Sequence, residues 1–304
     1  MYNPEIKNRY INRKESETIL NKHLLKGIFE KTEKYENELN KDVCNFSYYD
    51  ISEFYKMIGS TSLGSLNSMN SQLSQYTSWC IHEGFVEDGQ NHFSEFSSSI
   101  LKNYLNIAKI NNTIITREEI ISLCNKLSNA RDCFIILSLF EYGKSKNFSD
   151  ISYARFCDIE GNILKLKSGR SVIISEQLKS IAEESYNSTS YVSIDGNRTF
   201  NLIDDGTIIK HRNEISEASE FAAGRKIYNL IVKIFNIYGL NDMSANNIVM
   251  SGILNMILEK SQKYGISPMQ YLDSDYISEI ENQYGVNRYT FKSNFVMTYT
   301  DYLK

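Results

Sequence analysis

Residues 140–152, FEYGKSKNFSDIS, join the end of one expected helix to the start of another. The stretch CFIILSLFEY, which ends just before Gly143, is apolar on nearly every side, as is typical of a helix in the centre of a core. Gly143 is expected to end that helix, because glycine is common immediately after a helix C-terminus. Lys144 and Lys146 follow it, so we expect two lysines at a junction between helices.

The spacing of the apolar residues changes after this junction, from a helical to an alternating pattern. Residues 162–175, NILKLKSGRSVIIS, alternate between apolar and polar side chains. Ser168 and Gly169 fit a tight turn in the middle of the stretch. The pattern predicts an antiparallel β-hairpin that carries Lys167 and Arg170.

Outside the hairpin the sequence predicts mainly helices. Thr116 and Glu119 fit a capping box, in which a hydroxyl and a carboxylate satisfy free backbone amides at a helix start. From Glu214 to the end of the chain the pattern is again helical. Asp-Gly pairs at 195–196 and 205–206 predict further short strands. In the first hundred residues the expected helices are 18–40, 47–59 and 63–84.

The third of these helices has an uncharged stretch, because no residue between Ser60 and Ile81 carries a formal charge. Its apolar residues fall on one helical face, which we expect to be buried. The opposite face is polar, and asparagine and glutamine can pair with adenine in the major groove of DNA. A solvent-exposed polar face is the alternative interpretation. The polar face consists of Asn67, Ser71, Ser74, Gln75 and Ser78.

The composition is that of an ordinary globular protein. The 304 residues include 41% hydrophobic and 23% charged residues, with a formal net charge of −4. This charge argues against a protein that coats nucleic acid, but a local cluster of cations lies between Lys144 and Arg170. The polar N-terminus does not resemble a signal peptide, and no apolar run approaches membrane-spanning length. We therefore expect a cytoplasmic protein.

Neither metal nor cofactor sites are predicted. The five cysteines have no CxxC spacing, so reduced thiols are the preferred interpretation. The four histidines are scattered without the spacing of metal ligands. Glycine-rich phosphate loops are missing from the sequence, so we expect no nucleotide cofactor.

The order of helix, glycine, cation, helix and lysine-bearing hairpin in residues 128–174 resembles the core of the tyrosine recombinases, or phage integrases. The N-terminal half resembles the helical core-binding domain of that family. The resemblance implies a mainly α fold: a helical, SAM-like core-binding domain over residues 1–110, and a recombinase-like helical domain with a small antiparallel sheet over 113–304.

Catalysis in that family needs two arginines that grip the scissile phosphate, a hairpin lysine, a histidine and a tyrosine nucleophile. Lys167 matches the hairpin lysine. Lys144 stands at the position of the first arginine, and a lysine cannot reproduce its bidentate fork. Asn246 and Val249 stand at the positions of the histidine and of the second arginine.

The later part of the family pattern is also incomplete. Tyr284, Gly285 and Val286 match a Leu-Gly-His motif without its histidine. Tyr299 and Tyr302 lie near the usual place of the nucleophile, but with loose spacing. The resemblance therefore implies no catalytic residues.

The cations that remain are suited to holding phosphates, although exposed lysines on a hairpin or helix are as often merely solvated. The helix around Arg225 and Lys226 resembles the major-groove helix of the family. The residues expected to contact DNA are Lys144, Lys146, Lys167, Arg170, Arg225, Lys226, Asn67, Ser71 and Gln75.

The whole pattern is similar to the integrase-like lytic-cycle repressors of SPβ-type Bacillus phages. This implies a transcriptional repressor that binds operator sites in double-stranded DNA, at the bacterial nucleoid, and maintains lysogeny. The alternatives are an active or partner-dependent recombinase and a protein-interaction module without DNA binding. The sequence leaves open whether the protein forms a homo-oligomer on DNA and which protein or peptide antirepressor relieves repression.

Overall fold

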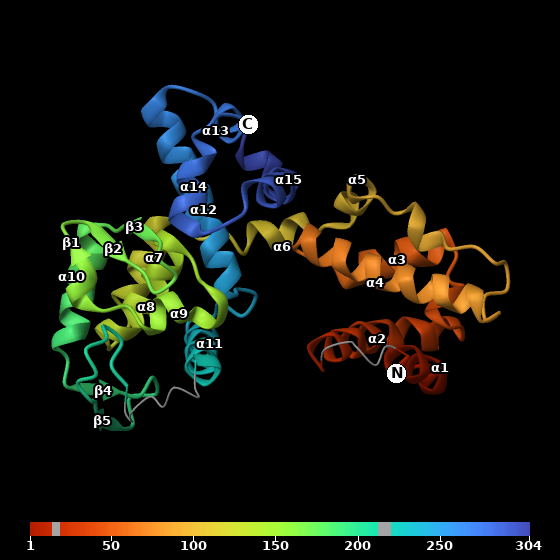
Figure 1. The fold of residues 1–304 in the computed structure, drawn as a ribbon, viewed down its shortest axis with the longest axis horizontal. Helices are drawn as coiled ribbons and strands as arrows, with labels where there is room; N and C mark the ends of the chain where they lie inside the picture. Colours follow the sequence, from red (N-terminus) through yellow and green to blue (C-terminus); the bar gives the residue numbers. More distant parts are fainter. Residues whose placement is uncertain (14–18, 212–219) are drawn as a thin grey trace. The chain divides into compact units, whose positions relative to one another are not determined.

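The computed structural model describes residues 1–13, 19–211 and 220–304, the side chains of 19–21 excepted, and the chain divides into two compact units (Figure 1). Unit 1 comprises Met1–Ile110 and Asn294–Tyr299. Unit 2 comprises Asn111–Ser293 and Thr300–Lys304. The sequence-based division placed 294–299 in the second domain, whereas these residues group with unit 1. The helical pattern expected at 214–219 lies outside the described residues.

Unit 1 is helical, as predicted. Ser47 forms a capping box with Asp50, and Gly59 ends the following helix with a φ of +54°. Short 3-10 turns lie at Val43–Asn45, His92–Glu95 and Lys102–Tyr104. The helices are α1 (Pro4–Asn12), α2 (Ile19–Leu39), α3 (Tyr48–Ile58), α4 (Leu63–His82), α5 (Ser98–Leu101) and α6 (Ile107–Asn111).

The core of unit 1 is built around α4. Its predicted apolar face is buried, with Leu66, Leu73, Tyr76 and Cys80 fully inaccessible to solvent. The Tyr76 ring packs edge-on against the rings of Tyr10 from α1 and Phe29 from α2. One aromatic cluster therefore joins three helices of this unit.

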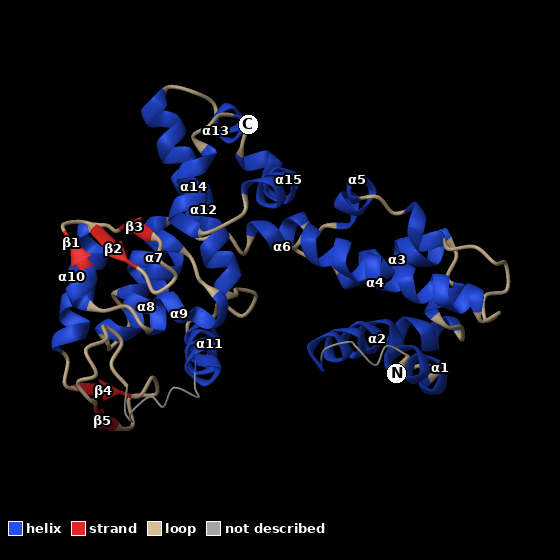
Figure 2. Cartoon of the chain, viewed as in Figure 1, coloured by secondary structure: helices blue, strands red, loops and turns tan. Residues whose placement is uncertain are grey.

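Unit 2 is also mainly helical, with two small antiparallel sheets (Figure 2). The first sheet has the order β1-β2-β3, and the second pairs β4 with β5. Its helices are α7 (Arg117–Cys124), α8 (Ala130–Tyr142), α9 (Ser149–Ser152), α10 (Glu176–Asn187), α11 (Glu220–Ile237), α12 (Ala245–Tyr264), α13 (Pro268–Asp273) and α14 (Ile277–Tyr284). Helix α15 (Arg288–Tyr299) begins in unit 2, and its residues from Asn294 group with unit 1. The strands of unit 2 are β1 (Ile159–Glu160), β2 (Ile163–Lys165), β3 (Ser171–Ile173), β4 (Ser190–Val192) and β5 (Thr199–Asn201).

Helix α8 is the centre of the core of unit 2, as its sequence predicts. Every residue from Asp132 to Tyr142 is buried, and α8 packs against α7, α10 and α12. The contact with α12 is very close at Gly252, where an added Cβ would lie 1.8 Å from the Phe140 carbonyl oxygen. The Tyr284 hydroxyl donates a hydrogen bond to the same oxygen at 2.7 Å. Glycine at 252 therefore allows α12 and α14 to meet the end of α8.

The hairpin prediction is confirmed. Leu164 pairs with Val172, and Gly169 turns the chain with a φ of +87°. The turn at 195–196 connects β4 and β5, also as predicted. The expected strand near 205–206 is wrong: in the described residues this segment makes only an isolated bridge between Arg155 and Thr207. Strand β1 was not predicted, because two residues show no alternation.

Helices long and apolar enough to cross a bilayer are not found in the part of the chain that the structure describes.

Candidate DNA interface

Several positions that the resemblance to the tyrosine recombinases links to catalysis lie close together in unit 2. Gly143 follows α8 with a φ of +80°. A Cβ at Gly143 would lie 3.2 Å from Tyr284 Cδ1 and 3.5 Å from Val249 Cγ1. The end of α8, α12 and the end of α14 therefore meet at the residue before Lys144.

Lys144 and Lys146 are exposed beside this meeting point. Neither pairs with a carboxylate of the described residues. The Lys144 Nζ lies 5.5 Å from the centre of the Phe148 ring. Apolar surroundings desolvate this amine and lower its pKa. Because Lys144 and Lys146 are both exposed, we expect their side chains to be accessible to an anion.

The backbone after these lysines is strained and tightly packed. Asn147 and Phe148 both have left-handed backbone angles, with φ values of +54° and +55°. A Cβ on Gly224 of α11 would lie 2.2 Å from the Asn147 carbonyl oxygen. Conformations of this kind persist only where the surrounding packing enforces them, and they cluster at functional sites. Glycine at 224 thus allows α11 to pack against the backbone of Asn147, directly after Lys146.

Arg225 and Lys226 follow Gly224 directly and are both exposed. They have no ion-pair partner within the described residues. The packing at Gly224 places α11 against the connection that carries Lys144 and Lys146, so four of the predicted DNA contacts come from two segments of unit 2 that pack together.

Arg170 is placed differently from the other predicted contacts. Its Nη2 lies 2.9 Å from Oδ2 of Asp150, which is completely buried. Its Nη1 donates to the Gln283 carbonyl oxygen at 2.9 Å. Asp150 also accepts the backbone N–H and the hydroxyl of Ser168. A Cβ on Gly285 would lie 3.0 Å from the Arg170 Cζ. This guanidinium therefore fastens the hairpin turn to α9 and to the end of α14.

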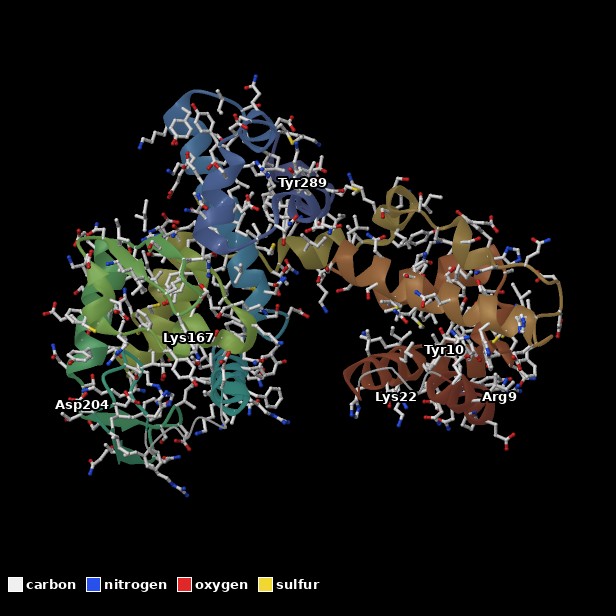
Figure 3. All side chains as sticks on the ribbon, viewed as in Figure 1. Arg9, Tyr10, Lys22, Lys167, Asp204 and Tyr289 are labelled. Carbon is white, nitrogen blue, oxygen red and sulfur yellow. The ribbon has the colours of Figure 1, made fainter. Side chains whose placement is uncertain are left out.

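Lys167 lies on the hairpin turn and is half-exposed. Its Nζ is 3.1 Å from Glu220 and 3.7 Å from the centre of the Tyr153 ring; Figure 3 labels it among the side chains of unit 2. Arg155, Lys165 and Lys167 line a hollow of about 500 Å³ together with Asp158 and Asp205. Arg155 was not among the predicted contacts, and its sequence signal was its place in the cation-rich segment.

The structure also places the remaining positions that the family resemblance links to catalysis. Val249 is 5% exposed and presents a methyl group where the resemblance implies an arginine. Asn246 is exposed and cannot take the place of an imidazole in proton transfer. The Tyr302 hydroxyl donates to Asn111 at 2.9 Å, and Tyr299 is buried in unit 1.

The polar face of α4 in unit 1 is only partly free. Asn67 Oδ1 accepts a hydrogen bond from the Ser98 hydroxyl at 2.9 Å, which ties it to α5. Ser71 and Gln75 are exposed, and their side chains contact each other at 3.3 Å. These two residues are better placed than Asn67 to reach a base.

Groups of three or more histidine, cysteine or acidic side chains that could hold a metal are not found among the described residues. The cysteines are free thiols, four of them buried and Cys157 exposed.

Comparisons with known proteins match this chain to an integrase-like family over both of its units. The profile described as "MrpR, C-terminal catalytic domain" matches residues 114–303, and "MrpR, N-terminal core-binding domain" matches residues 1–82. The chain is 25% identical over 280 residues to the SPbeta prophage-derived uncharacterized protein YopR of Bacillus subtilis (strain 168), covering 88% of this chain and 84% of YopR.

The fold is similar to that of a solved integrase. A lambda integrase(75-356) dimer bound to a COC' core site superposes with a TM-score of 0.51 at 13% sequence identity. The superposition covers 96% of this chain and 94% of the integrase chain.

Proposed function

Because the chain belongs to the MrpR family, with an integrase-like fold, we propose that it is a sequence-specific DNA-binding protein that represses phage lytic genes and catalyses no strand transfer. Its partner is double-stranded operator DNA. The relative from the SPbeta prophage supports a role in maintaining lysogeny.

The observation that carries this proposal is the environment of Val249. Its side chain packs beside Gly143 and Tyr284, where a strand-transfer enzyme of this fold would hold a phosphate. A buried methyl group can neither donate a hydrogen bond to a phosphate nor stabilise the charge that develops on it. DNA binding needs no such group, because exposed cations elsewhere can neutralise phosphates.

We assign each proposed contact according to whether its side chain is exposed and whether it already has a partner in the protein. Lys144, Lys146, Arg225 and Lys226 hold phosphates, because each is exposed and has no carboxylate partner in the described parts of the chain. Lys167 does so after exchanging Glu220 for a phosphate. On α4, Ser71 and Gln75 read base edges, while Asn67 contributes through the amide that Ser98 leaves free.

Arg170 has a double role in this proposal. It fixes the hairpin turn through Asp150, and the 18% of its side chain that stays exposed is available to a phosphate, which would agree with the contact expected from the sequence.

The purified protein is expected to bind specific fragments of its own phage genome and to leave them uncut. Fragments would be recovered by pull-down and sequenced, and each selected site would then be offered as a nicked suicide substrate. We expect a retarded complex without protein that stays on the DNA after denaturation. A tyrosine-linked oligonucleotide after protease digestion would identify an active recombinase, and failure to retard any genomic fragment at low salt would identify a protein-interaction module.

Lys144→Ala and Lys167→Ala are each expected to lower affinity by a similar factor on all related sites. Each substitution removes about one phosphate contact, so the slope of log K against log salt should shrink by about 0.9. Binding would be measured by fluorescence anisotropy at several salt concentrations. Lys263→Ala is the matched control, because Lys263 is an exposed lysine of unit 2 on α12, outside the predicted interface. A change in the preferred sequence for any one variant would contradict its assignment to a phosphate.

A further inference from the structure

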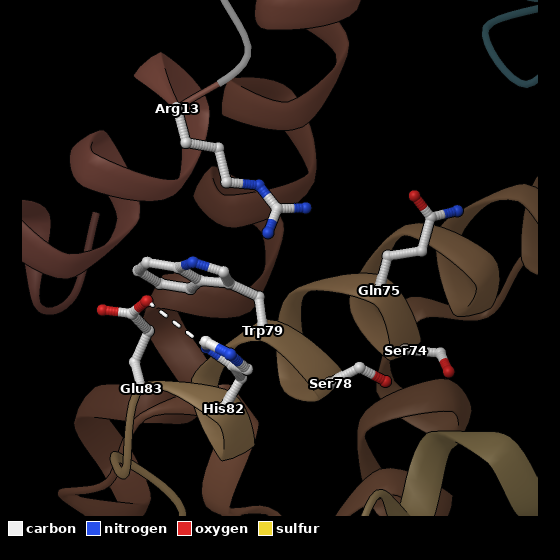
Figure 4. Close-up of a pocket in the computed structure, with 7 residues that line it drawn as sticks. All are labelled: Arg13, Ser74, Gln75, Ser78, Trp79, His82 and Glu83. Carbon is white, nitrogen blue, oxygen red and sulfur yellow. Dashed lines mark ion pairs between the residues drawn. The ribbon is translucent and has the colours of Figure 1, made fainter.

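A hollow of about 570 Å³ lies in unit 1 between the end of α1 and the polar face of α4 (Figure 4). Arg13, just after α1, extends over the indole of Trp79, and Gln75 lies on a neighbouring turn of α4. The hollow is lined by Arg13, Ser74, Gln75, Ser78, Trp79, His82 and Glu83.

The guanidinium of Arg13 is held by aromatic rings and not by an acid. Its Cζ lies 4.2 Å from the centre of the Tyr10 ring and 5.7 Å from that of Trp79. Among the described residues it has no carboxylate partner. Stacking of this kind fixes the plane of a guanidinium while leaving its N–H groups free to donate.

The wall formed by α4 presents hydrogen-bond donors. The amide nitrogen of Asn91 donates to the hydroxyl oxygens of Ser74 at 3.1 Å and Ser78 at 2.8 Å. Because these oxygens already accept, their protons can point into the hollow. The carboxylate of Glu83 is paired with Arg9, which offsets its charge at the rim. The hollow therefore favours a ligand that accepts hydrogen bonds and carries negative charge.

The helix that precedes Arg13 is held in place by a buried ion pair between α1 and α2. Lys7 of α1 and Glu36 of α2 are both completely buried, and the Lys7 amine donates to both carboxylate oxygens. This pair holds α1 against α2. The packing of α1 places Arg13 beside Trp79 in the structure without a ligand, and a contact that is already placed lowers the entropic cost of binding.

We propose that this hollow binds one phosphodiester group of the operator, with Arg13 as the main contact, beside the base pair that Gln75 reads. The proposal rests on the proposed function and adds α1 to the surface that contacts DNA. Phosphate contacts fix the register of a protein on the duplex, so Arg13 would set which base pair meets Gln75.

The test uses the fluorescence of Trp79, which is the single tryptophan of the chain and lines this hollow. Full-length protein would be titrated with a selected genomic fragment, and emission and anisotropy would be followed together. We expect Trp79 emission to change as the fragment binds. Arg13→Ala should lower affinity about 10-fold or more and shrink the salt slope by about 0.9. Arg13→Lys should recover the slope but only part of the affinity, because lysine lacks the planar fork.

The matched control is Lys34→Ala, which removes an exposed cation of the same unit from a helix-surface pair with Glu38. A second arm replaces single operator phosphates with neutral methylphosphonates. At one position the replacement should weaken wild-type binding but leave Arg13→Ala binding unchanged. Inorganic phosphate and a mononucleotide, titrated at constant ionic strength, distinguish a DNA site from a site for a free phosphate ligand.

The outcomes separate the two proposals. Normal operator binding by Arg13→Ala, with unaltered Trp79 emission in the wild type, would overturn the assignment of this hollow and leave the proposed function standing. Saturable binding of free phosphate without any effect of Arg13→Ala on DNA would also overturn it. If the wild-type chain binds no genomic fragment, the proposed function fails, and this inference fails with it.

Discussion

Gly252→Ala is expected to unfold unit 2 or to destabilise it by roughly 3 kcal/mol or more. The added Cβ would lie 1.8 Å from the Phe140 carbonyl oxygen and 2.9 Å from the Tyr284 hydroxyl oxygen. Neither the carbonyl nor the backbone of α12 can move without separating α12 from α8. The hydrogen bond from Tyr284 to Phe140 would be lost as well. Against a total stability of about 5–15 kcal/mol, this loss is large.

The measurement is chemical denaturation followed by circular dichroism, with Gly27→Ala as the matched control. Gly27 lies inside α2 and has no heavy atom within 4 Å of an added Cβ. Alanine is a better helix former than glycine, so the control should stabilise the protein by about 0.5–1 kcal/mol. A Gly252→Ala variant as stable as the control would mean that α12 and α8 are farther apart than described.

Much of the fold could be predicted from the sequence, because local signals were strong. The capping box at Thr116 and Glu119 and the helix-ending glycine at 59 are formed as expected. The apolar period of α4 correctly predicted its buried face. The segment at 205–206 shows the limit of such signals, since an Asp-Gly pair specifies a turn but not whether a strand follows it.

The surroundings of the candidate site were harder to predict, because residue type does not reveal a distant partner. Arg170 reads as a free hairpin cation, yet its partners lie 20 positions before it at Asp150 and 113 positions after it at Gln283. Gly224 reads as an ordinary helical glycine, and only the fold shows Asn147 against it. The local pattern around Arg13 gave no indication that Trp79 lies beside it, because 66 positions separate them.

The two units therefore use cations in different ways. In unit 2 the hairpin arginine is bound to a buried aspartate, whereas the predicted contacts on α11 and on the α8–α9 connection have no acid partner among the described residues. In unit 1 an aromatic stack orients Arg13 without neutralising it. A protein that grips DNA without cutting it needs correctly placed charge and no activated nucleophile, and both arrangements meet that need.

Lys7→Met is expected to destabilise unit 1 by about 3–5 kcal/mol, because it leaves the carboxylate of Glu36 buried without its cation. Glu36 also accepts the Val43 N–H at 2.7 Å and the Thr32 hydroxyl at 2.7 Å, so it cannot turn to solvent without losing both. Burial raises the pKa of Glu36, and the attraction of Lys7 opposes that effect. Removing Lys7 should therefore raise this pKa further.

The pH dependence of Lys7→Met has a definite sign. A carboxyl whose pKa is higher in the folded than in the unfolded chain stabilises the fold below its unfolded pKa, and this contribution is lost as the pH rises through the folded value. Lys7→Met should therefore be closest to the wild type below about pH 4.5, the ordinary pKa of a glutamate carboxyl, and should lose stability relative to the wild type as the pH rises through the raised pKa of Glu36. Adding Glu36→Gln should restore most of the stability and remove the pH dependence, because the amide oxygen still accepts from Val43. Urea denaturation of the single and double variants across this pH range is the measurement.

A single variant whose loss of stability is the same at every pH, or a double variant no more stable than the single one, would show that an unpaired Glu36 charge is not the cause. Since α1 also carries Arg13 to its hollow, the double variant should regain operator binding together with its stability.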